Sequence, residues 1–338
     1  MTVVGPFGVS VRDTALDAEI RAGLAAVEAG LVEATKSDVP FLTETAQHLV
    51  RAGGKRFRPL LTLLASRFGD PDAPGVVPAA VVVELTHLAT LYHDDIMDEA
   101  EVRRGVPSAN ANWDNSVAVL TGDFLFARAS AIVAELGPQA VRIQAEAFGR
   151  LVTGQMQETS GPRPGQDPVG HYLDVVAGKT GSLIAVSMRL GSLLAGVEEP
   201  FVNVLAQFGE RIGVAFQLAD DVLDIASDEL ESGKTPGTDL REGVATLPVL
   251  RLREMAAGEG PAAAADRELL DLVESDLSDD ARHAEALARL RRHPALAQAR
   301  RDALSFADQA RQTLTPLPDI PARRALAELC DAVADRAV

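Results

Sequence analysis

Hydrophobic residues recur along most of this chain at intervals of three and four positions, which is the spacing of an amphipathic helix. Residues 14–35, TALDAEIRAGLAAVEAGLVEAT, show it clearly, with an apolar stripe beside charged positions. The same spacing predicts helices at 41–51, 56–69, 76–103, 115–135, 138–158, 172–195 and 200–227. Alternating strand patterns with hairpin turns are nearly absent, so the chain is predicted to be all-α.

One segment also suits a β-strand. Residues 76–84, VVPAAVVVE, are rich in β-branched side chains, which favour strands. No turn signal separates this segment from the helical pattern of LTHLATLYHDD that follows it. We therefore predict a helix here as well.

Turn-forming residues separate the predicted helices. They lie at 68–75, 160–170, 232–239 and 256–266. The last of these, AAGEGPAAAAD, has a low-complexity composition and predicts a surface loop ahead of a C-terminal helical tail at 266–336. No short internal repeat is present, and a length of 338 residues suits either one large domain or two ordinary ones, of which we expect one domain over 1–338.

Composition narrows the class of protein. The hydrophobic fraction is 47% and the charged fraction 24%, as in folded globular proteins. A net charge of −17 argues against a nucleic-acid partner. The single cysteine, Cys330, excludes an intramolecular disulfide, and the sequence shows neither a signal-peptide pattern nor about 18 consecutive apolar residues. We expect a cytoplasmic protein with no transmembrane segment.

Two dense carboxylate clusters follow apolar runs, DDIMD at 94–98 and DDVLD at 220–224. Residues four apart share one face of a helix, so Asp94 lies beside Asp98 and the second cluster repeats the pairing. Such carboxylates repel one another, and burial raises their pKa values unless a cation compensates. Carboxylate oxygens are the ligands that Mg²⁺ prefers, together with water and substrate phosphates.

An acidic quintet on its own could be a solvated helix end. Negative charge at a helix C-terminus opposes the helix dipole, however, and here the arrangement occurs twice on apolar helices. Two copies therefore favour magnesium sites.

Basic residues accompany both clusters. They are Lys55, Arg56 and Arg58 in GGKRFRP, Arg103 and Arg104 in EVRRG, Lys179 in AGKTGS, and Lys234 in SGKTPG. Any one of them could be a surface cation or a charge at a helix C-terminus. Arginine forks match phosphate oxygens, so together with two metal clusters these residues indicate a site for two diphosphates.

These motifs resemble those of the trans-isoprenyl diphosphate synthase (polyprenyl synthetase) family, long-chain type. The similarity covers roughly 45–250 and rests on GGKRFRP, HLATLYHDDIMDEAEVRRG, LTGDFLFARA, GKT, FQLADDVLD and GKTPGTDLREG. The resemblance implies an isoprenoid synthase type I fold, a single large helical bundle around a central apolar cavity, usually as a homodimer.

The resemblance also implies a magnesium-dependent prenyltransferase that joins isopentenyl diphosphate head-to-tail to an allylic diphosphate. Cleavage of the allylic C–O bond leaves negative charge on the departing diphosphate, which magnesium and Arg or Lys side chains stabilise. The isopentenyl double bond then attacks the allylic cation. In the family the released diphosphate takes the proton, so we expect no side-chain general base.

The resemblance assigns a role to each matching position. The magnesium ligands are expected to be Asp94, Asp98 and Asp220, with about three ions per site. Supporting carboxylates are expected at Asp95, Asp221 and Asp224. Isopentenyl diphosphate is expected to bind Lys55, Arg58, His87 and Arg104, the allylic diphosphate Arg103, Lys179 and Lys234, and the cation to lie between Thr180 and Gln217.

Two positions depart from the family pattern. Val244 stands in REGVATLP where many members have a lysine, and GQMQE at 154–158 replaces the more usual GExxQ. A missing cation weakens diphosphate binding by about 1–3 kcal/mol or less. The core of the expected site is unaffected.

Product length depends on what lines the cavity upstream of the first aspartates. Ala89 and Thr90 lie about 6–8 Å before Asp94 along the helix, and neither is bulky. Family members that stop at about 15 or 20 carbons commonly have an aromatic residue near this level, so the resemblance implies an open shaft here and a product of about 35–50 carbons, such as a quinone side-chain precursor. These small residues could instead permit close helix packing. Phe148 is another candidate for the residue that closes the bottom of the cavity.

Several other functions fit part of the pattern. Three of these alternatives are enzymes. They are a shorter-chain farnesyl or geranylgeranyl diphosphate synthase, a class I terpene synthase, and an HD-type phosphohydrolase that uses His93 beside Asp94. A terpene synthase does not need GGKRFRP, and the phosphohydrolase leaves 220–224 unexplained. A non-catalytic subunit of a heteromeric synthase is the remaining alternative. His48, His171, His283 and His293 lack ligand spacing and are expected to be ordinary histidines.

Overall fold

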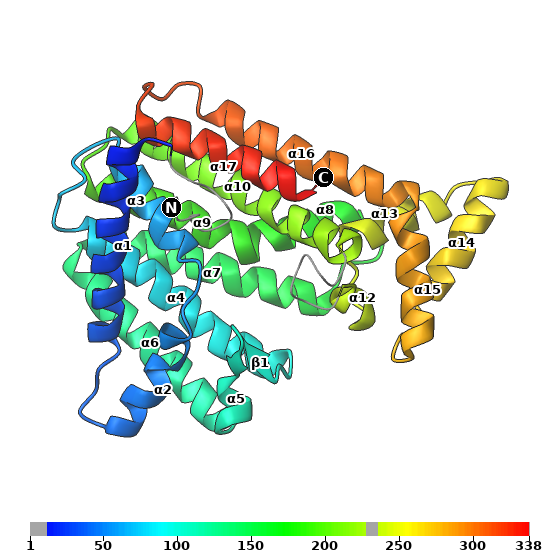
Figure 1. Ribbon diagram of the computed structural model, residues 1–338, viewed down its shortest axis with the longest axis horizontal. Coiled ribbons are helices and arrows are strands. Elements are labelled where there is room, and N and C mark those ends of the chain that lie inside the picture. The colour runs from blue at the N-terminus through cyan, green and yellow to red at the C-terminus, as the bar shows by residue number, and fades with distance from the viewer. Residues whose placement is uncertain (1–11, 228–235, 338) are drawn as a thin grey trace. The chain divides into compact units, whose positions relative to one another are not determined.

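The computed structural model describes residues 12–227 and 236–337, and nearly all of them are helical (Figure 1). The helices of the first half are α1 (Thr14–Ala34), α2 (Pro40–Arg51), α3 (Phe57–Ser66), α4 (Val76–Met97), α5 (Ala109–Asn112), α6 (Asn115–Glu135) and α7 (Pro138–Ser160). Those of the second half are α8 (Pro168–Val176), α9 (Ser182–Leu194), α10 (Glu199–Ala226), α12 (Thr238–Arg241), α13 (Leu247–Ala256), α14 (Pro261–Val273), α15 (Asp280–Arg291), α16 (Pro294–Thr313) and α17 (Pro321–Ala337). The all-α prediction is confirmed.

A small antiparallel hairpin is the sheet in the described residues. Strand β1 (Val102–Arg103) pairs with β2 (Val106–Pro107). The helix predicted to run to residue 103 ends at Met97, because Glu99 adopts a left-handed backbone with φ 49° and turns the chain into this hairpin. The ambiguous segment 76–84 is helical, as predicted.

Two other predicted boundaries were wrong. The helix expected over 172–195 is divided by a π-helical turn, η2 (Ala177–Gly181), in the glycine-containing AGKTG segment. The surface loop expected over 256–266 is partly helical, since α14 begins at Pro261. Proline suits the first helical position, and the alanines after it have the highest helix propensity.

The chain divides into two compact units. Unit 1 comprises the described parts of Met1–Gly149, Ser182–Gly209 and Thr313–Glu328. Unit 2 comprises the described parts of Arg150–Gly181, Glu210–Gln312 and Leu329–Val338. The single-domain organisation over 1–338 stays a prediction.

Helix α4 lies at the centre of unit 1, where it packs against α1, α3, α6 and α9 (Figure 1). Its apolar side chains point in nearly all directions, and Val82, Leu85 and Leu88 are completely buried. Each such side chain contributes roughly 1.5–3 kcal/mol to folding. The hydroxyl of Tyr92, also buried, donates to the Thr45 carbonyl at 2.5 Å and so links α4 to α2. The polar residues of α4 are therefore held on a rigid element.

Unit 2 is built mainly from helices of the C-terminal part of the chain. In it, α13 packs against α8 and α14, and α15 packs against α14 and α12. Cys330, in α17, is buried, and burial raises its pKa to about 12. This thiol is therefore a packing residue, as its isolation in the sequence predicts.

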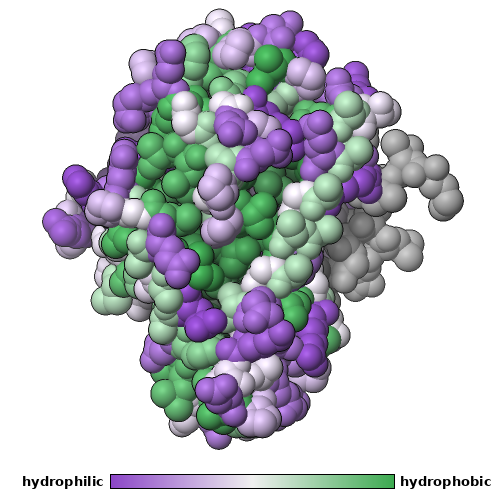
Figure 2. Space-filling model, turned by 90° about the vertical axis from the view of Figure 1, so that its left-hand side faces the viewer, coloured by the Kyte–Doolittle hydropathy of each residue, from purple (hydrophilic) through white to green (hydrophobic). Residues whose placement is uncertain are grey.

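Two helices are long and apolar enough to cross a membrane by length and composition alone, α4 and α6. The apolar stretch of α4 is 72% buried inside the protein, which is typical of a core helix. The stretch in α6 is only 33% buried. Figure 2 shows apolar side chains, in green, on the face that Figure 1 has on its left-hand side.

Candidate active site

One face of α4 carries most of the polar side chains of a first cluster, which lies in unit 1. Glu84, His87, Asp94 and Asp98 follow one another at intervals of three, seven and four residues, so they lie along one side of an otherwise apolar helix. From His87 to Asp94 the helix rises by about 10 Å. The helix thus presents a histidine part-way along its length and two carboxylates at its end.

The two outer aspartates stand where α4 stops. Asp98 is the C-cap, and its N–H donates to the carbonyl of Asp94 at 2.8 Å. Asp94 is half-buried and Asp98 is exposed. Both carboxylates lie at the negative end of the helix dipole, an arrangement that a cation would stabilise.

Asp95 points to the other side of the helix and is completely buried. Burial raises its pKa, and the Arg103 guanidinium, which donates from Nε at 2.5 Å, partly offsets that effect. The hairpin β1–β2 brings Arg103 to this position. Arg103 is therefore the counter-ion of Asp95, and because a guanidinium has five donors it could still bind a phosphate.

Three arginines gather around Glu84. Arg56, which is 6% exposed, binds Glu84 at 3.1 Å and also pairs with Glu28. Arg104 lies 3.8 Å from Glu84 and donates to the carbonyls of Leu49 and Gly53. These contacts assign Arg56 a structural role, which sequence reasoning did not separate from that of its neighbours.

Arg58 is the arginine whose charge is least compensated in this group. Its Nε is shut off from solvent and has no hydrogen-bond partner. Burial lowers the pKa of Arg58 to about 10, with Arg104 adding to the effect and Glu84 opposing it. The pKa of His87 is lowered well below its usual value by burial and then by Arg58 and Arg104, so His87 is neutral at pH 7. Such excess positive charge favours an anion.

The glycines of GGKRFRP make room for this arrangement. Gly54 has φ 144°, and a Cβ at this position would lie 2.9 Å from the guanidinium carbon of Arg104. A residue with a side chain at this position would be strained by the positive φ and would displace the Arg104 guanidinium. Lys55, next in the chain, is exposed.

A second cluster lies in unit 2, around the C-terminal end of α10. The Asp220 carboxylate accepts from Arg336 of α17 at 2.5 Å, and the same guanidinium lies 5.0 Å from the centre of the Phe216 ring. Both members of the ion pair remain partly exposed. Such a pair contributes at most about 1 kcal/mol to stability.

Asp221 serves a different purpose from its neighbour. It is 1% exposed and accepts hydrogen bonds from the Tyr172 hydroxyl, from Gln217 Nε2 at 3.2 Å and from the Leu247 N–H at 3.3 Å. Burial raises its pKa to about 7, and the three hydrogen bonds act against that rise. Asp221 thus accepts three hydrogen bonds in the protein interior.

Asp224 is anchored by backbone. Its carboxylate accepts the N–H groups of Thr238 and Asp239 at 3.2 and 3.3 Å. The Gly237 N–H donates to its carbonyl at 2.8 Å. The third aspartate of this motif is therefore tied to the turn that begins α12.

Lys179 and Thr180 lie on the π-helical turn η2 of unit 2. Lys179 Nζ pairs with Glu158 at 2.7 Å, and Thr180 Oγ1 lies 3.4 Å from Gln217 Oε1. Gly154 allows the turn to pack, since a Cβ there would lie 2.8 Å from the Lys179 backbone nitrogen. π-Helical turns are frequent at functional sites, and this one carries Lys179 and places Thr180 beside Gln217.

The histidines make packing and hydrogen-bonding contacts. His93 lies against α6, with Nε2 3.2 Å from the Val119 carbonyl and 3.6 Å from Asp123. A Cβ at Gly122 would collide with this ring. The Nε2 atom of His93 is thus used within the fold.

The donor set fits a hard divalent cation. Carboxylate pairs at the ends of α4 and α10 offer only oxygen ligands, and Mg²⁺ typically takes one or two carboxylates and completes its shell with water and phosphate oxygens. Within the described ranges, no three His, Cys, Asp or Glu side chains are arranged as a ready metal cage. Residues of this type would therefore hold the ion jointly with a phosphate-bearing ligand.

A comparison with known families decides the identity of the chain, since the polyprenyl synthetase family matches residues 39–290. The chain belongs to the polyprenyl synthetase family. It is 50% identical over 331 residues to a nonaprenyl diphosphate synthase of Mycobacterium tuberculosis, covering 97% of each protein. The predicted resemblance and the prenyltransferase class are confirmed.

Solved structures agree with this assignment. A decaprenyl diphosphate synthase from Rhodobacter capsulatus superposes with a TM-score of 0.86 at 35% identity, over 96% of this chain and 99% of that one. A geranylgeranyl pyrophosphate synthase from Corynebacterium glutamicum, complexed with calcium and isoprenyl diphosphate, gives 0.84 at 44% identity, over 96% and 98%. The predicted isoprenoid synthase fold is confirmed, and a relative holds a divalent cation together with an isoprenyl diphosphate.

The predicted chain-length residues of this polyprenyl synthetase are both in the interior of unit 1. Ala89 is completely buried in the apolar core, and Thr90 donates from Oγ1 to the His87 carbonyl at 2.8 Å. Phe148 packs against Phe126 with ring centroids 4.4 Å apart and the ring planes tilted by 56°. The shaft beside Ala89 and Thr90 stays a prediction.

Lys234 lies outside the described residues. Val244, at the position where many family members have a lysine, is exposed. The residues that sequence reasoning missed are Glu84, Tyr172, His283 and Arg336, which contact predicted site residues or the turn that anchors Asp224. Glu84 shares the helical face of His87 and could have been found by its spacing.

Proposed function

We propose that this polyprenyl synthetase condenses isopentenyl diphosphate head-to-tail with an allylic diphosphate and builds a long all-trans polyprenyl diphosphate. The observation that carries the proposal is the buried, partnerless Nε of Arg58 among like charges, on the same helix bundle as the first aspartate pair. A terpene synthase, which takes one diphosphate, has no use for this second anion site. The names of the relatives favour long products.

Each residue then has a proposed task. Lys55, Arg58, His87 and Arg104 bind the isopentenyl diphosphate, with neutral His87 donating a hydrogen bond. Arg103, Lys179 and Lys234 bind the allylic diphosphate, and Thr180 and Gln217 face the cation. As the C–O bond breaks, the electron pair leaves with the diphosphate, and these cations stabilise it. The released diphosphate takes the proton that the new chain loses.

We propose Asp94, Asp98 and Asp220 as the ligands of Mg²⁺, with about three ions in the complete site. When bound, magnesium supplies Lewis-acid stabilisation of the departing diphosphate. Asp95 and Asp221 support their neighbours from inside the fold, where Arg103 and Tyr172 hold them. Removal of Mg²⁺ with EDTA is expected to abolish turnover.

The test is incorporation of labelled isopentenyl diphosphate by the purified chain with Mg²⁺ and geranyl, farnesyl or geranylgeranyl diphosphate as primer. We expect elongation and a long extracted product. A product that stops at farnesyl or geranylgeranyl length would support a short-chain synthase. No elongation with any primer would favour a non-catalytic subunit of a heteromeric enzyme.

Ala89→Phe is expected to shorten the product, because a phenyl ring at this fully buried position would block the proposed shaft. Overpacking also costs about 1–3 kcal/mol of stability, so a variant with the same added bulk elsewhere in the core is needed. Ala129→Phe, on α6, is the matched control, since Ala129 is equally buried. Product length by chromatography decides, and an unchanged length in a folded Ala89→Phe protein would contradict the shaft.

We propose that the chain forms a homodimer through α6. Its exposed residues include Val119, Leu120, Ala127, Ser130, Ala131 and Ala134, with the carboxylate of Asp123 among them, and Leu120 is 65% exposed. Small and apolar residues on a helix of this hydropathy are suited to a twofold contact with a second α6. We also propose a cytoplasmic location and one functional domain over 1–338.

Leu120→Glu is expected to convert the dimer to a monomer, because two charges would be buried at a twofold contact. Sedimentation or light scattering measures the mass. Val32→Glu, at an exposed apolar position of α1, is the control and should remain dimeric. A wild-type chain that sediments as a monomer would exclude the dimer.

A further inference from the structure

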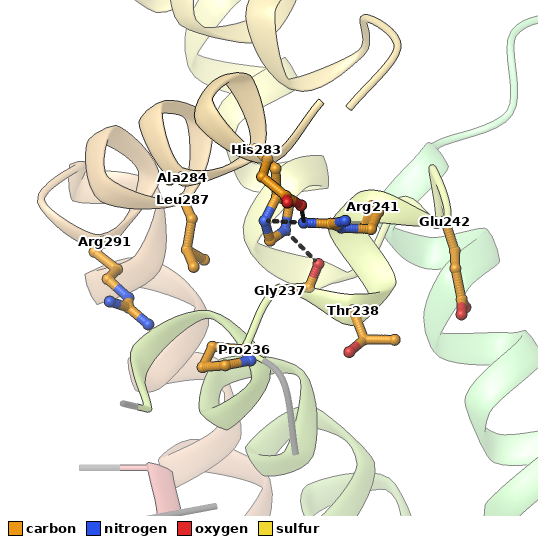
Figure 3. Close-up of a pocket in the computed structure, with 10 residues that line it drawn as sticks. Pro236, Gly237, Thr238, Arg241, Glu242, His283, Ala284, Leu287 and Arg291 are labelled. Carbon is orange, nitrogen blue, oxygen red and sulfur yellow. Dashed lines mark hydrogen bonds and ion pairs between the residues drawn. The ribbon is translucent and has the colours of Figure 1, made fainter. Parts of the chain in front are cut away.

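Helix α15 of the C-terminal tail contacts the turn that follows the second aspartate motif (Figure 3). His283, which is 5% exposed, places Nε2 2.8 Å from the Gly237 carbonyl oxygen and Nδ1 3.2 Å from Arg241 Nη2. A carbonyl only accepts and a guanidinium only donates, so Nε2 carries the hydrogen and Nδ1 accepts. The neutral imidazole thereby joins two points of the turn.

The same helix holds the far end of α12. Arg241 Nη2 also binds the Asp280 carboxylate at 2.8 Å, so the four-residue helix is tied to α15 through both Gly237 and Arg241. These residues line a hollow of about 650 Å³ between α12 and α15, together with Thr238 and Leu287. Figure 3 shows His283 and Arg241 meeting above the Gly237 carbonyl.

The positive φ and the missing side chain of Gly237 permit the contact with His283. Its φ is 71°, and a Cβ would lie 2.8 Å from His283 Nε2. Any side chain would be strained and would also push the imidazole away from the carbonyl. The close approach of His283 to this turn is thus built into the backbone.

Backbone N–H groups of this turn donate hydrogen bonds to the Asp224 carboxylate. With Gly237 held, the next two N–H groups, of Thr238 and Asp239, point at Asp224 Oδ1 and Oδ2. One amide on each oxygen fixes the carboxylate plane, and a carboxylate oxygen can accept a further contact. Asp224 is therefore oriented by backbone that α15 holds in place.

Helix α15 also reaches the chain directly after Asp224. Arg291, at its C-terminal end, donates from Nε to the Ile225 carbonyl at 2.6 Å and from Nη2 to the Ser227 carbonyl. His283 and Arg291 lie eight residues apart on one face of the helix. The tail thus contacts the motif both where α10 ends and where α12 begins.

We propose that α15 positions the second aspartate motif, with His283 as a positioning residue that orients Asp224 through Gly237 and the Thr238 and Asp239 amides. The proposal rests on the proposed function, in which this motif binds a metal–diphosphate ligand. It assigns the C-terminal tail a part in metal binding. His283 itself touches neither substrate nor metal.

The test compares three variants of the full chain. His283→Ala removes both contacts, and His283→Gln keeps a donor for Gly237 and an acceptor for Arg241. His293→Ala is the control, because His293 also lies in the tail and binds Asp266 at 2.9 Å but does not contact the turn. Mn²⁺ binding in the presence of inorganic pyrophosphate is measured by electron paramagnetic resonance, and amide exchange is measured over 236–241.

We expect His283→Ala to bind Mn²⁺ about three- to tenfold more weakly, the effect of losing one or two neutral hydrogen bonds. Amides over 236–241 should exchange faster, while the KM for isopentenyl diphosphate stays unchanged. His283→Gln should recover to within about twofold of the wild type, and His293→Ala should match it.

Wild-type Mn²⁺ affinity in His283→Ala would overturn the positioning role, as would a His283→Gln protein as weak as the alanine variant. An equal loss in His293→Ala would reduce the effect to general loosening of the tail and would also overturn it. A wild-type chain that shows the His283 dependence but elongates no primer would overturn the proposed function alone.

Discussion

Replacement of Asp94 or Asp220 by alanine is expected to lower kcat by about a thousandfold or more, since several kcal/mol of transition-state stabilisation depends on metal held by these carboxylates. Both side chains are partly exposed, so the fold should persist. Asp174→Ala is the control, because Asp174 is an exposed aspartate of α8. Steady-state turnover at saturating substrate and Mg²⁺, with circular dichroism of each variant, measures the effect.

Asp220 requires a second control, because it pairs with Arg336. Arg336→Ala removes the ion pair and leaves the carboxylate in place. If the loss in Asp220→Ala arose from the broken pair, Arg336→Ala would reproduce it. Near-normal turnover in Arg336→Ala alongside an inactive Asp220→Ala would assign the loss to metal binding, and turnover within tenfold of wild type in Asp94→Ala would refute the ligand assignment.

Arg58→Ala is expected to raise the KM for isopentenyl diphosphate by about 10- to 100-fold, with a smaller change in kcat, because a charge-assisted hydrogen bond contributes about 1.5–3 kcal/mol. Stability should not fall, since the variant removes a cation whose pKa burial and Arg104 already lower to about 10. Inorganic pyrophosphate should raise the Tm of the wild type by more than that of the variant.

Two further variants test whether the effect on KM is specific to the Arg58 guanidinium. Arg58→Lys should be intermediate, because lysine keeps the charge but loses the fork. Arg51→Ala, at an exposed position of α2 where Arg51 binds Gln47, should leave the KM unchanged. An Arg58→Ala protein with wild-type KM and the full pyrophosphate effect would show that the second anion binds elsewhere.

Local sequence was sufficient for the helices and for the motifs. The 76–84 segment could be assigned as helix because the period of three and four continued through it without a turn. Asp94 and Asp98 share a face for the same geometric reason. Boundaries failed where backbone conformation departed from the helix, at Glu99 and in η2, because no side-chain periodicity reports such a change.

The roles within each motif could not be read in the same way. Asp94 and Asp95 are adjacent and chemically identical, yet one is half-buried at the end of α4 and the other is enclosed beside Arg103. Likewise, Arg56 and Arg58 stand two residues apart, but only Arg56 meets two carboxylates. Which way each side chain points follows from the packing of α4 against its neighbours.

The sequence by itself determined that this chain is helical, that it carries two aspartate motifs and a basic hexamer, and that it belongs among diphosphate-binding prenyltransferases. Only the tertiary structure decided that the buried Nε of Arg58 has no hydrogen-bond partner, that Asp221 accepts three internal hydrogen bonds, and that His283 holds the turn anchoring Asp224. The physical reason is that periodicity follows from one helix at a time, whereas burial and charge compensation depend on residues that are tens of positions apart along the chain.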